Sequence, residues 1–193
     1  MAVLMVLDIP GATLEQYDRT NEILGIHGDE DAPAGLISHA AGPTDDGVVV
    51  VDIWESGEAL ESFFEERGVV RAMQEAGAPE PGEPRVLHVH NHFEGGGTKA
   101  GVLMLAELDD FGTDRYDAMA EIMNAHMPED DTHPAVHHAA AVTESGGMLI
   151  VDIWDSQEAF GAFAQEAIAP AGEAAGVEPF EPRFVPVYRR IKG

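Results

Sequence analysis

The sequence predicts an α+β protein made of two copies of a ferredoxin-like β-α-β-β-α-β unit. Two observations support this prediction. The second half of the 193-residue chain repeats the first half, and each half has strand-like and helix-like segments in the order of that unit. We expect one repeat over 1–94 and the other over 101–193, joined by a flexible glycine-rich linker at 95–100.

The internal repeat is clearest where a strand ends and a helix begins. Val51-Asp-Ile-Trp54 recurs as Val151-Asp-Ile-Trp154, and seven of the thirteen residues in 52–64 are identical in 152–164. Further matches lie on both sides of this segment at an offset of 98 to 100 residues: Tyr17-Asp18 with Tyr116-Asp117, and Glu83-Pro84-Arg85 with Glu181-Pro182-Arg183. A nearly constant offset over a whole half indicates the duplication of one unit.

Each element of the first repeat has a local signal. A helix is expected over 14–25, where Thr13 and Gln16 form a capping box, and Ser56 is expected to cap the second helix. The strands are apolar runs bounded by turn residues, and they are expected at 2–8, 35–42, 48–54 and 85–91. The first and last strands of the second repeat are expected at 102–108 and 183–189.

The apolar surface of one repeat needs a second covering layer. The strand at 48–54 is apolar on both faces, which is typical of a strand that is covered on both sides. The two helices of one unit cover only one face of its sheet. We therefore expect the two repeats to pack sheet to sheet, as a pseudo-dimer within one chain that exists as a monomer or a homodimer.

The composition excludes several classes of function. Lys and Arg number 10 against 36 Asp and Glu, and a net charge of −26 disfavours binding to nucleic acid or to an anionic membrane. The acidic, lysine-poor composition suits a halophilic source, and the composition bias of a GC-rich genome would look similar. The absence of cysteine excludes disulfides and cysteine-based catalysis or metal binding. With no long apolar span and no recognisable signal peptide, we expect a cytoplasmic location.

The predicted hairpin brings a histidine against an aspartate in each repeat. If the residues at the two ends of the turn pair with each other, His39 lies opposite Asp52, and His138 lies opposite Asp152. Side chains opposed in this way have Cβ atoms about 4.5–5.5 Å apart. Two interpretations stay open: a structural pair that neutralises a buried carboxylate, or an imidazole that an aspartate orients for use as a base or ligand.

Aromatic residues recur near both predicted pairs. Trp54 and Trp154 lie two residues beyond the aspartates on the same strand face, as core residues or as walls of a cavity. Tyr17 and Tyr116 recur on the first helix, as core residues or as groups that point into a pocket between helix and sheet.

The last strand of the first repeat carries the candidate metal ligands His88 and His90. Alternate residues of a strand lie on one face, so this pair could bind a metal ion, or it could simply be a polar strand end. The matched residues of the second repeat are Pro186 and Tyr188, so the fold does not require histidine there.

The Asp-x-Trp strand end followed by a Ser-capped helix resembles the dimeric α/β-barrel superfamily in a tandem form, and most of all its antibiotic-biosynthesis-monooxygenase-like branch. The resemblance covers nearly the whole chain. It implies an intramolecular α/β barrel, and its members include cofactor-independent monooxygenases, haem-degrading enzymes, chlorite dismutases and lactone isomerases. Two departures matter: Val50 and Ile150 replace the asparagine of the quinone-forming monooxygenases, and 66–76 and 166–176 lack the haem-ligating histidine.

The sequence and the resemblance together predict binding of a small apolar or aromatic metabolite, with oxidation or isomerisation that needs no tightly bound cofactor. His39 and His138 would take a proton, and Asp52 and Asp152 would fix the tautomer of each imidazole. Two alternatives stay open: a metal- or haem-binding protein that uses the strand histidines, and a non-catalytic ligand carrier. If only one repeat is active, the first is favoured.

Overall fold

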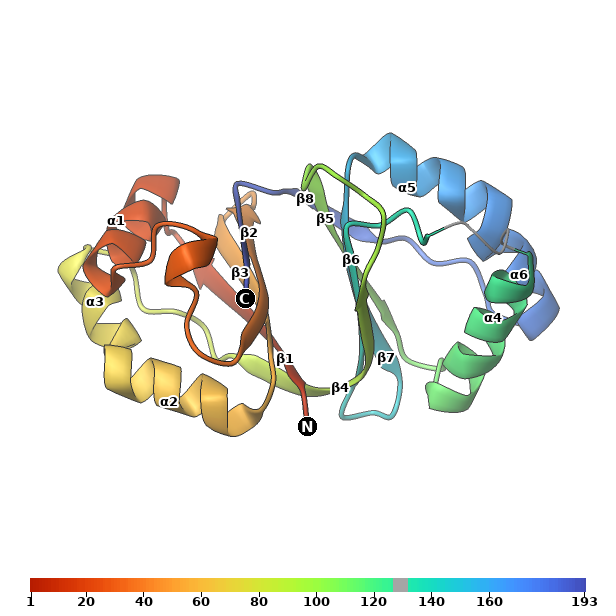
Figure 1. Cartoon of the computed structure of the whole chain (residues 1–193), viewed down its shortest axis with the longest axis horizontal. Coiled ribbons are helices and arrows are strands. Elements are labelled where there is room, and N and C mark those ends of the chain that lie inside the picture. The colour runs from red at the N-terminus through yellow and green to blue at the C-terminus, as the bar shows by residue number, and fades with distance from the viewer. Residues whose placement is uncertain (127–131) are drawn as a thin grey trace. The chain divides into compact units, whose positions relative to one another are not determined.

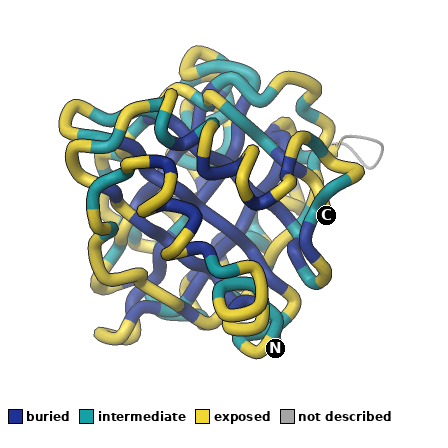
Figure 2. Tube along the Cα trace, turned by 90° about the vertical axis from the view of Figure 1, so that its left-hand side faces the viewer, coloured by how far each residue is buried: buried dark blue, intermediate teal, exposed yellow. Residues whose placement is uncertain are grey.

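The computed structural model describes residues 1–126 and 132–193 and has the predicted α+β architecture. The chain forms two compact units, one made of 1–88 with 185–193 and the other of 89–184. In both, antiparallel strands carry helices on one face (Figure 1). Most of the buried residues lie on the strands, and many of the exposed residues lie on helices and loops (Figure 2). None of the described helices combines the length and the apolar character that a membrane crossing requires.

The first unit holds five strands in the order β4-β1-β3-β2-β9. Their bounds are β1 (Val3–Pro10), β2 (Leu36–Pro43), β3 (Gly47–Trp54), β4 (Arg85–Glu94) and β9 (Arg189–Lys192). The helices that cover this sheet are α1 (Leu14–Leu24), α2 (Gly57–Arg67) and α3 (Val69–Glu75), and a short 3₁₀ turn lies at Asp29–Asp31. As expected, β3 is buried along nearly its whole length.

The second unit repeats this arrangement with the strand order β8-β5-β7-β6-β4. Its elements are β5 (Val102–Leu108), β6 (His137–Val142), β7 (Met148–Trp154), β8 (Arg183–Pro186), α4 (Thr113–His126), α5 (Gln157–Phe163) and α6 (Ala169–Ala175). A π-helical segment at Ala164–Ile168 joins α5 to α6. In the first unit, Gly68 in the left-handed conformation (φ 63°) separates α2 from α3 instead.

The predicted helix starts are confirmed. Thr13 accepts a hydrogen bond from the backbone N–H of Gln16, and the Gln16 side chain accepts one from the backbone N–H of Thr13. Ser56 and Ser156 each accept a bond of 3.2 Å from the N–H three residues later. These caps satisfy donors that the first turn of a helix otherwise leaves free, so the capping pattern fixes where α1, α2 and α5 begin.

The end of the second repeat does not form one strand over 183–189 as predicted. It forms β8 and β9, with Val187 and Tyr188 between them. Pro186 has no N–H and therefore cannot extend the hydrogen-bond ladder. The Tyr188 N–H instead bonds to the carbonyl of Ala41 at 2.8 Å, and β9 pairs with β2 of the first unit.

The last strand of the first repeat is also shared between units. Its start, up to His88, pairs with β1, and β4 also borders β6 of the second unit. Each compact unit is therefore completed by residues from the end of the other repeat. The compact units and the sequence repeats 1–94 and 101–193 are two divisions of the same chain that differ at these exchanged ends.

The glycine-rich connection at 95–100 is packed against the second unit. The N–H groups of Gly95, Gly96 and Gly97 bond to carbonyls in 133–136 at 2.8–3.2 Å. A Cβ atom on Gly95 would lie 2.2 Å from the carbonyl oxygen of Ala135. Glycine is therefore needed here for a close backbone approach, and the connection is not the free flexible spacer that its composition predicts.

Candidate active site

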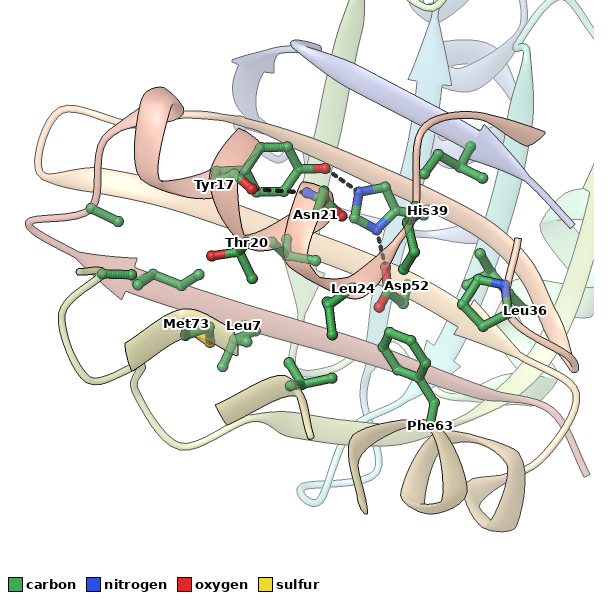
Figure 3. Close-up of a pocket in the computed structure, with 18 of the residues that line it drawn as sticks. Leu7, Tyr17, Thr20, Asn21, Leu24, Leu36, His39, Asp52, Phe63 and Met73 are labelled. Carbon is green, nitrogen blue, oxygen red and sulfur yellow. Dashed lines mark hydrogen bonds and ion pairs between the residues drawn. The ribbon is translucent and has the colours of Figure 1, made fainter. Parts of the chain in front are cut away.

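Three buried side chains, Tyr17, His39 and Asp52, form a row of hydrogen bonds between helix and sheet in the first unit, which we call the Tyr–His–Asp chain (Figure 3). The predicted register is confirmed, because His39 on β2 is paired directly with Asp52 on β3. His39 Nδ1 lies 2.7 Å from Asp52 Oδ1, and His39 Nε2 lies 2.6 Å from the hydroxyl of Tyr17 on α1. The histidine and the aspartate are 8% and 4% exposed. Because Tyr17 lies on α1, this hydrogen bond places the site on the face of the sheet that the helices cover.

The same chain recurs in the second unit. His138 on β6 is paired with Asp152 on β7, as the sequence predicts. Its Nδ1 lies 2.7 Å from Asp152 Oδ1, and its Nε2 lies 2.7 Å from the hydroxyl of Tyr116 on α4. The extra residue in the turn of this hairpin leaves the pairing intact, because Thr143 still bonds to Gly147 across it.

The hydrogen bonds fit a protonation pattern in which Asp52 is ionised and His39 is neutral. An ionised Asp52 can only accept, so a neutral His39 carries its proton on Nδ1 and uses the Nε2 lone pair to accept from Tyr17. Burial raises the pKa of Tyr17, and the nearby Arg189 only partly opposes this. Burial likewise raises the pKa of Tyr116, with Asn91 opposing. Both phenols therefore stay protonated at neutral pH and serve as donors.

Each Tyr–His–Asp chain forms a polar patch in the wall of an apolar cavity. The first cavity has a volume of about 80 Å³ and the second about 70 Å³. The apolar walls of the first include Leu7, Leu24, Trp54, Phe63 and Met73; those of the second include Met104, Phe111, Met123, Phe163 and Phe180. An apolar cavity with a few convergent polar groups is the usual form of a small-molecule site.

The two tryptophans differ in their hydrogen bonding. Trp54 is 1% exposed, lines the first cavity and packs on Phe63, with ring centroids 5.1 Å apart. Its Nε1 has no hydrogen-bond partner among the described residues. Trp154 instead donates to Asp152 Oδ2 at 3.2 Å and is not among the described residues that line the second cavity. The expected wall position is therefore taken by Trp54 alone.

The exchanged strand ends contact the tyrosine and its neighbouring aspartate in each unit. In the first unit, Tyr188 packs edge-on against Tyr17 and donates to Asp18, and Arg189 pairs with Asp18 at 3.1 Å. In the second unit, His90 pairs with Asp117 at 2.7 Å and packs edge-on against Tyr116. Asn91 donates a hydrogen bond to the Tyr116 hydroxyl at 2.9 Å. This explains why the last strands of the repeats carry different residues: they complete different sites.

The two candidate metal ligands have different surroundings. His90 is bound to Asp117 and belongs to the second compact unit, whereas His88 is exposed and belongs to the first. Within 1–126 and 132–193, no group of three or more His, Asp or Glu side chains is arranged to hold a metal ion. A role for His88 and His90 as metal ligands stays a prediction.

His133 is a site residue that the sequence reasoning missed. It lines the second cavity beside His138, with ring centroids 6.0 Å apart, and packs against Phe163 at 4.6 Å. Burial lowers its pKa to about 4, so the ring is neutral at neutral pH. The matched residue of the first repeat is Ala34, so the duplication, which identified the other site residues, gives no signal for this one.

Comparison with solved structures places the fold among known proteins. A protein from Fusobacterium nucleatum named "putative monooxygenase" is similar over 99% of this chain and 94% of its own, with a TM-score of 0.67 and 8% identity. Another of that name from Lactobacillus acidophilus matches over 99% and 96%, with a TM-score of 0.67 and 9% identity. A protein named "putative chlorite dismutase" matches over 97% and 95%, with a TM-score of 0.56 and 12% identity.

These likenesses concern the fold. They show that the fold of this chain, over both repeats, is shared with proteins named as monooxygenases. No protein-family model and no curated protein sequence matches the chain. What the cavities bind therefore depends on their own residues.

Proposed function

We propose that each cavity binds a small apolar or aromatic molecule and that the Tyr–His–Asp chain in its wall moves a proton to or from that molecule. One observation carries the proposal: the same three side chains, with the same pairing, adjoin an apolar cavity in both repeats. A purely structural ion pair would not need an apolar cavity of matching size beside it in each unit.

The order of the hydrogen bonds suggests the proton path. Tyr17 lines the cavity, and its hydroxyl lies 2.6 Å from Nε2 of a neutral His39, to which it donates a hydrogen bond. When the bound molecule gives up a proton to the Tyr17 oxygen, Tyr17 passes its proton to Nε2. The histidine becomes an imidazolium that Asp52 stabilises, and the bound molecule becomes an anion. Because burial disfavours a free tyrosinate, the two transfers occur together.

This step serves either of the two expected reactions. In an isomerase the proton returns to a different carbon of the bound anion, with no net oxidation. In a cofactor-independent monooxygenase the anion reacts with dioxygen, which is the oxidant and a second substrate. The fold likeness to proteins named as monooxygenases supports the second reaction without deciding it.

The metal or haem alternative fits the histidines less well. Both ring nitrogens of His39 and of His138 are engaged in hydrogen bonds, so neither ring has a nitrogen lone pair free for iron. An absorption spectrum with elemental analysis of the purified protein tests this alternative: a Soret band or stoichiometric metal would reinstate it.

Hydrogen exchange into a simple ketone tests the proposal without a known substrate. In D₂O, 2-indanone loses its α C–H signals by nuclear magnetic resonance (NMR) wherever a base removes those protons. We expect the protein to accelerate this loss, and the double variant His39→Gln/His138→Gln to lose at least about a hundredfold of the acceleration. His27→Gln alters an exposed histidine and is the matched control.

The outcomes separate a proton-moving site from a ligand carrier. If the double variant folds and exchanges the ketone as fast as the original protein, the histidines are not the base. If Asp52→Asn/Asp152→Asn lowers the melting temperature but leaves exchange unchanged, the His–Asp pairs only stabilise the fold, and the carrier alternative holds.

A further inference from the structure

We propose that the two cavities are non-equivalent binding sites, and that each recognises a hydrogen-bond acceptor on its ligand through a different ring N–H: Trp54 in the first unit and His133 in the second. This inference rests on the proposed binding function and adds the ligand class. The ligands would be small apolar rings that carry an uncharged oxygen acceptor, such as a carbonyl.

The evidence in the first unit is an unsatisfied donor. Trp54 is almost completely buried and lines the cavity, yet its Nε1–H meets no acceptor among the described residues. Buried donors are nearly always paired, because an unpaired one loses its hydration without compensation. At the matched position Trp154 has such a partner, the carboxylate of Asp152. The fold can therefore satisfy this N–H internally, and in the first unit it has no partner among the described residues.

The evidence in the second unit is an additional imidazole. The backbone N–H of Ala135 donates to His133 Nδ1 at 3.2 Å, so the neutral ring carries its proton on Nε2. No hydrogen bond joins Nε2 to any described residue. The ring lies at the cavity between Phe93 and Phe163, with centroids 5.1 and 4.6 Å away. An uncommitted N–H in an apolar wall is again a donor for a ligand.

The two donors come from different places in the repeat. Trp54 ends β3, whereas His133 lies in the segment before β6, where the first repeat has Ala34. Each cavity thus has one available ring N–H, at non-corresponding positions. A ligand whose oxygen meets Trp54 in the first cavity would not present it to His133 in the second. The repeats have therefore diverged in what they bind while keeping the same Tyr–His–Asp chain.

Two probes of the same shape test this directly. Acetophenone and α-methylstyrene differ only in that a C=O of the first is a C=CH₂ in the second. In ¹H–¹⁵N spectra, we expect acetophenone to shift the Trp54 indole N–H as a new hydrogen bond does, and α-methylstyrene not to. The Trp154 indole N–H, already bonded to Asp152, should keep its hydrogen-bonded shift with both probes.

Binding to variants assigns the two donors. We expect each cavity to prefer acetophenone by about fivefold, the worth of one hydrogen bond. Trp54→Phe should remove the preference in the first cavity only, His133→Leu in the second only, and the double variant should bind both probes equally. Trp154→Phe, which removes a ring N–H that is already satisfied, is the control and should keep both preferences.

Each contrary result has its own meaning. If the protein binds both probes equally, or if Trp54→Phe and His133→Leu keep the preference, this inference is overturned and the proposed binding function stands. If it binds neither probe, the proposed function itself is contradicted and the inference falls with it.

Discussion

Removing one hydroxyl from the first Tyr–His–Asp chain has a calculable effect on stability. Tyr17→Phe keeps the aromatic ring in place but deletes the 2.6 Å hydrogen bond to His39 Nε2. That nitrogen is then buried without a donor, since His39 is 8% exposed. Leaving a buried acceptor unpaired costs about 1–3 kcal/mol. We therefore expect the free energy of unfolding to fall by that amount.

The change is large enough to measure by thermal denaturation. For a chain of this length, each kcal/mol corresponds to about 2–4 °C in melting temperature, so Tyr17→Phe should melt several degrees lower. Tyr188→Phe is a matched control, because it deletes an exposed hydroxyl bonded to Asp18 and should change stability by less than about 0.5 kcal/mol. If Tyr17→Phe is as stable as the original protein, the hydrogen-bonded chain is not formed and the argument fails.

Three further predictions concern stability alone. The pKa of His133 is 6.5 in the unfolded chain and about 4 in the folded protein, so its contribution to the free energy of unfolding is complete above pH 6.5 and is lost as the pH falls toward 4. His133→Leu should therefore flatten the drop in melting temperature between pH 7 and pH 5. An unchanged drop would contradict the lowered pKa. Gly95→Ala should lower the free energy of unfolding, measured by urea denaturation, by about 1–3 kcal/mol, because the added Cβ overpacks the backbone contact. Gly57→Ala, where a Cβ has open space, should not lower it. Equal effects of the two substitutions would refute the close backbone approach at Gly95. Ser56→Ala and Ser156→Ala should each cost about 1 kcal/mol in the same measurement through loss of a helix cap, and no loss at either serine would show that the cap is not formed there.

The local part of the site could be predicted from the sequence. Strand side chains alternate with a strict period of two, and a short turn fixes the register of a hairpin, so counting from the turn places His39 against Asp52. The extra turn residue in the second repeat lies outside the paired positions, so it leaves the pairing of His138 with Asp152 unchanged. Helix starts were predictable for the same reason: a cap is a contact between residues three apart.

The long-range part could not be predicted in this way. The hydrogen bond from Tyr17 to His39 depends on how α1 packs on the sheet, which no local pattern specifies. The exchange of the final strands depends on pairing between segments far apart in the chain, although Pro186 gave a signal that the predicted strand would break. His133 was not predicted as a site residue because the first repeat has no histidine at the matched position. The other site residues were selected because they recur in both repeats.

The central claim is that a neutral imidazole, held by an aspartate, presents Nε2 as the proton acceptor in each repeat. Histidine ¹⁵N NMR at neutral pH tests it most directly, because the nitrogen shifts distinguish the two neutral tautomers from the imidazolium. We expect His39 and His138 to carry a proton on Nδ1 and none on Nε2. A proton on Nε2 of either ring, as the other tautomer or as an imidazolium, would mean that the ring cannot accept a proton there and would contradict the proposed mechanism.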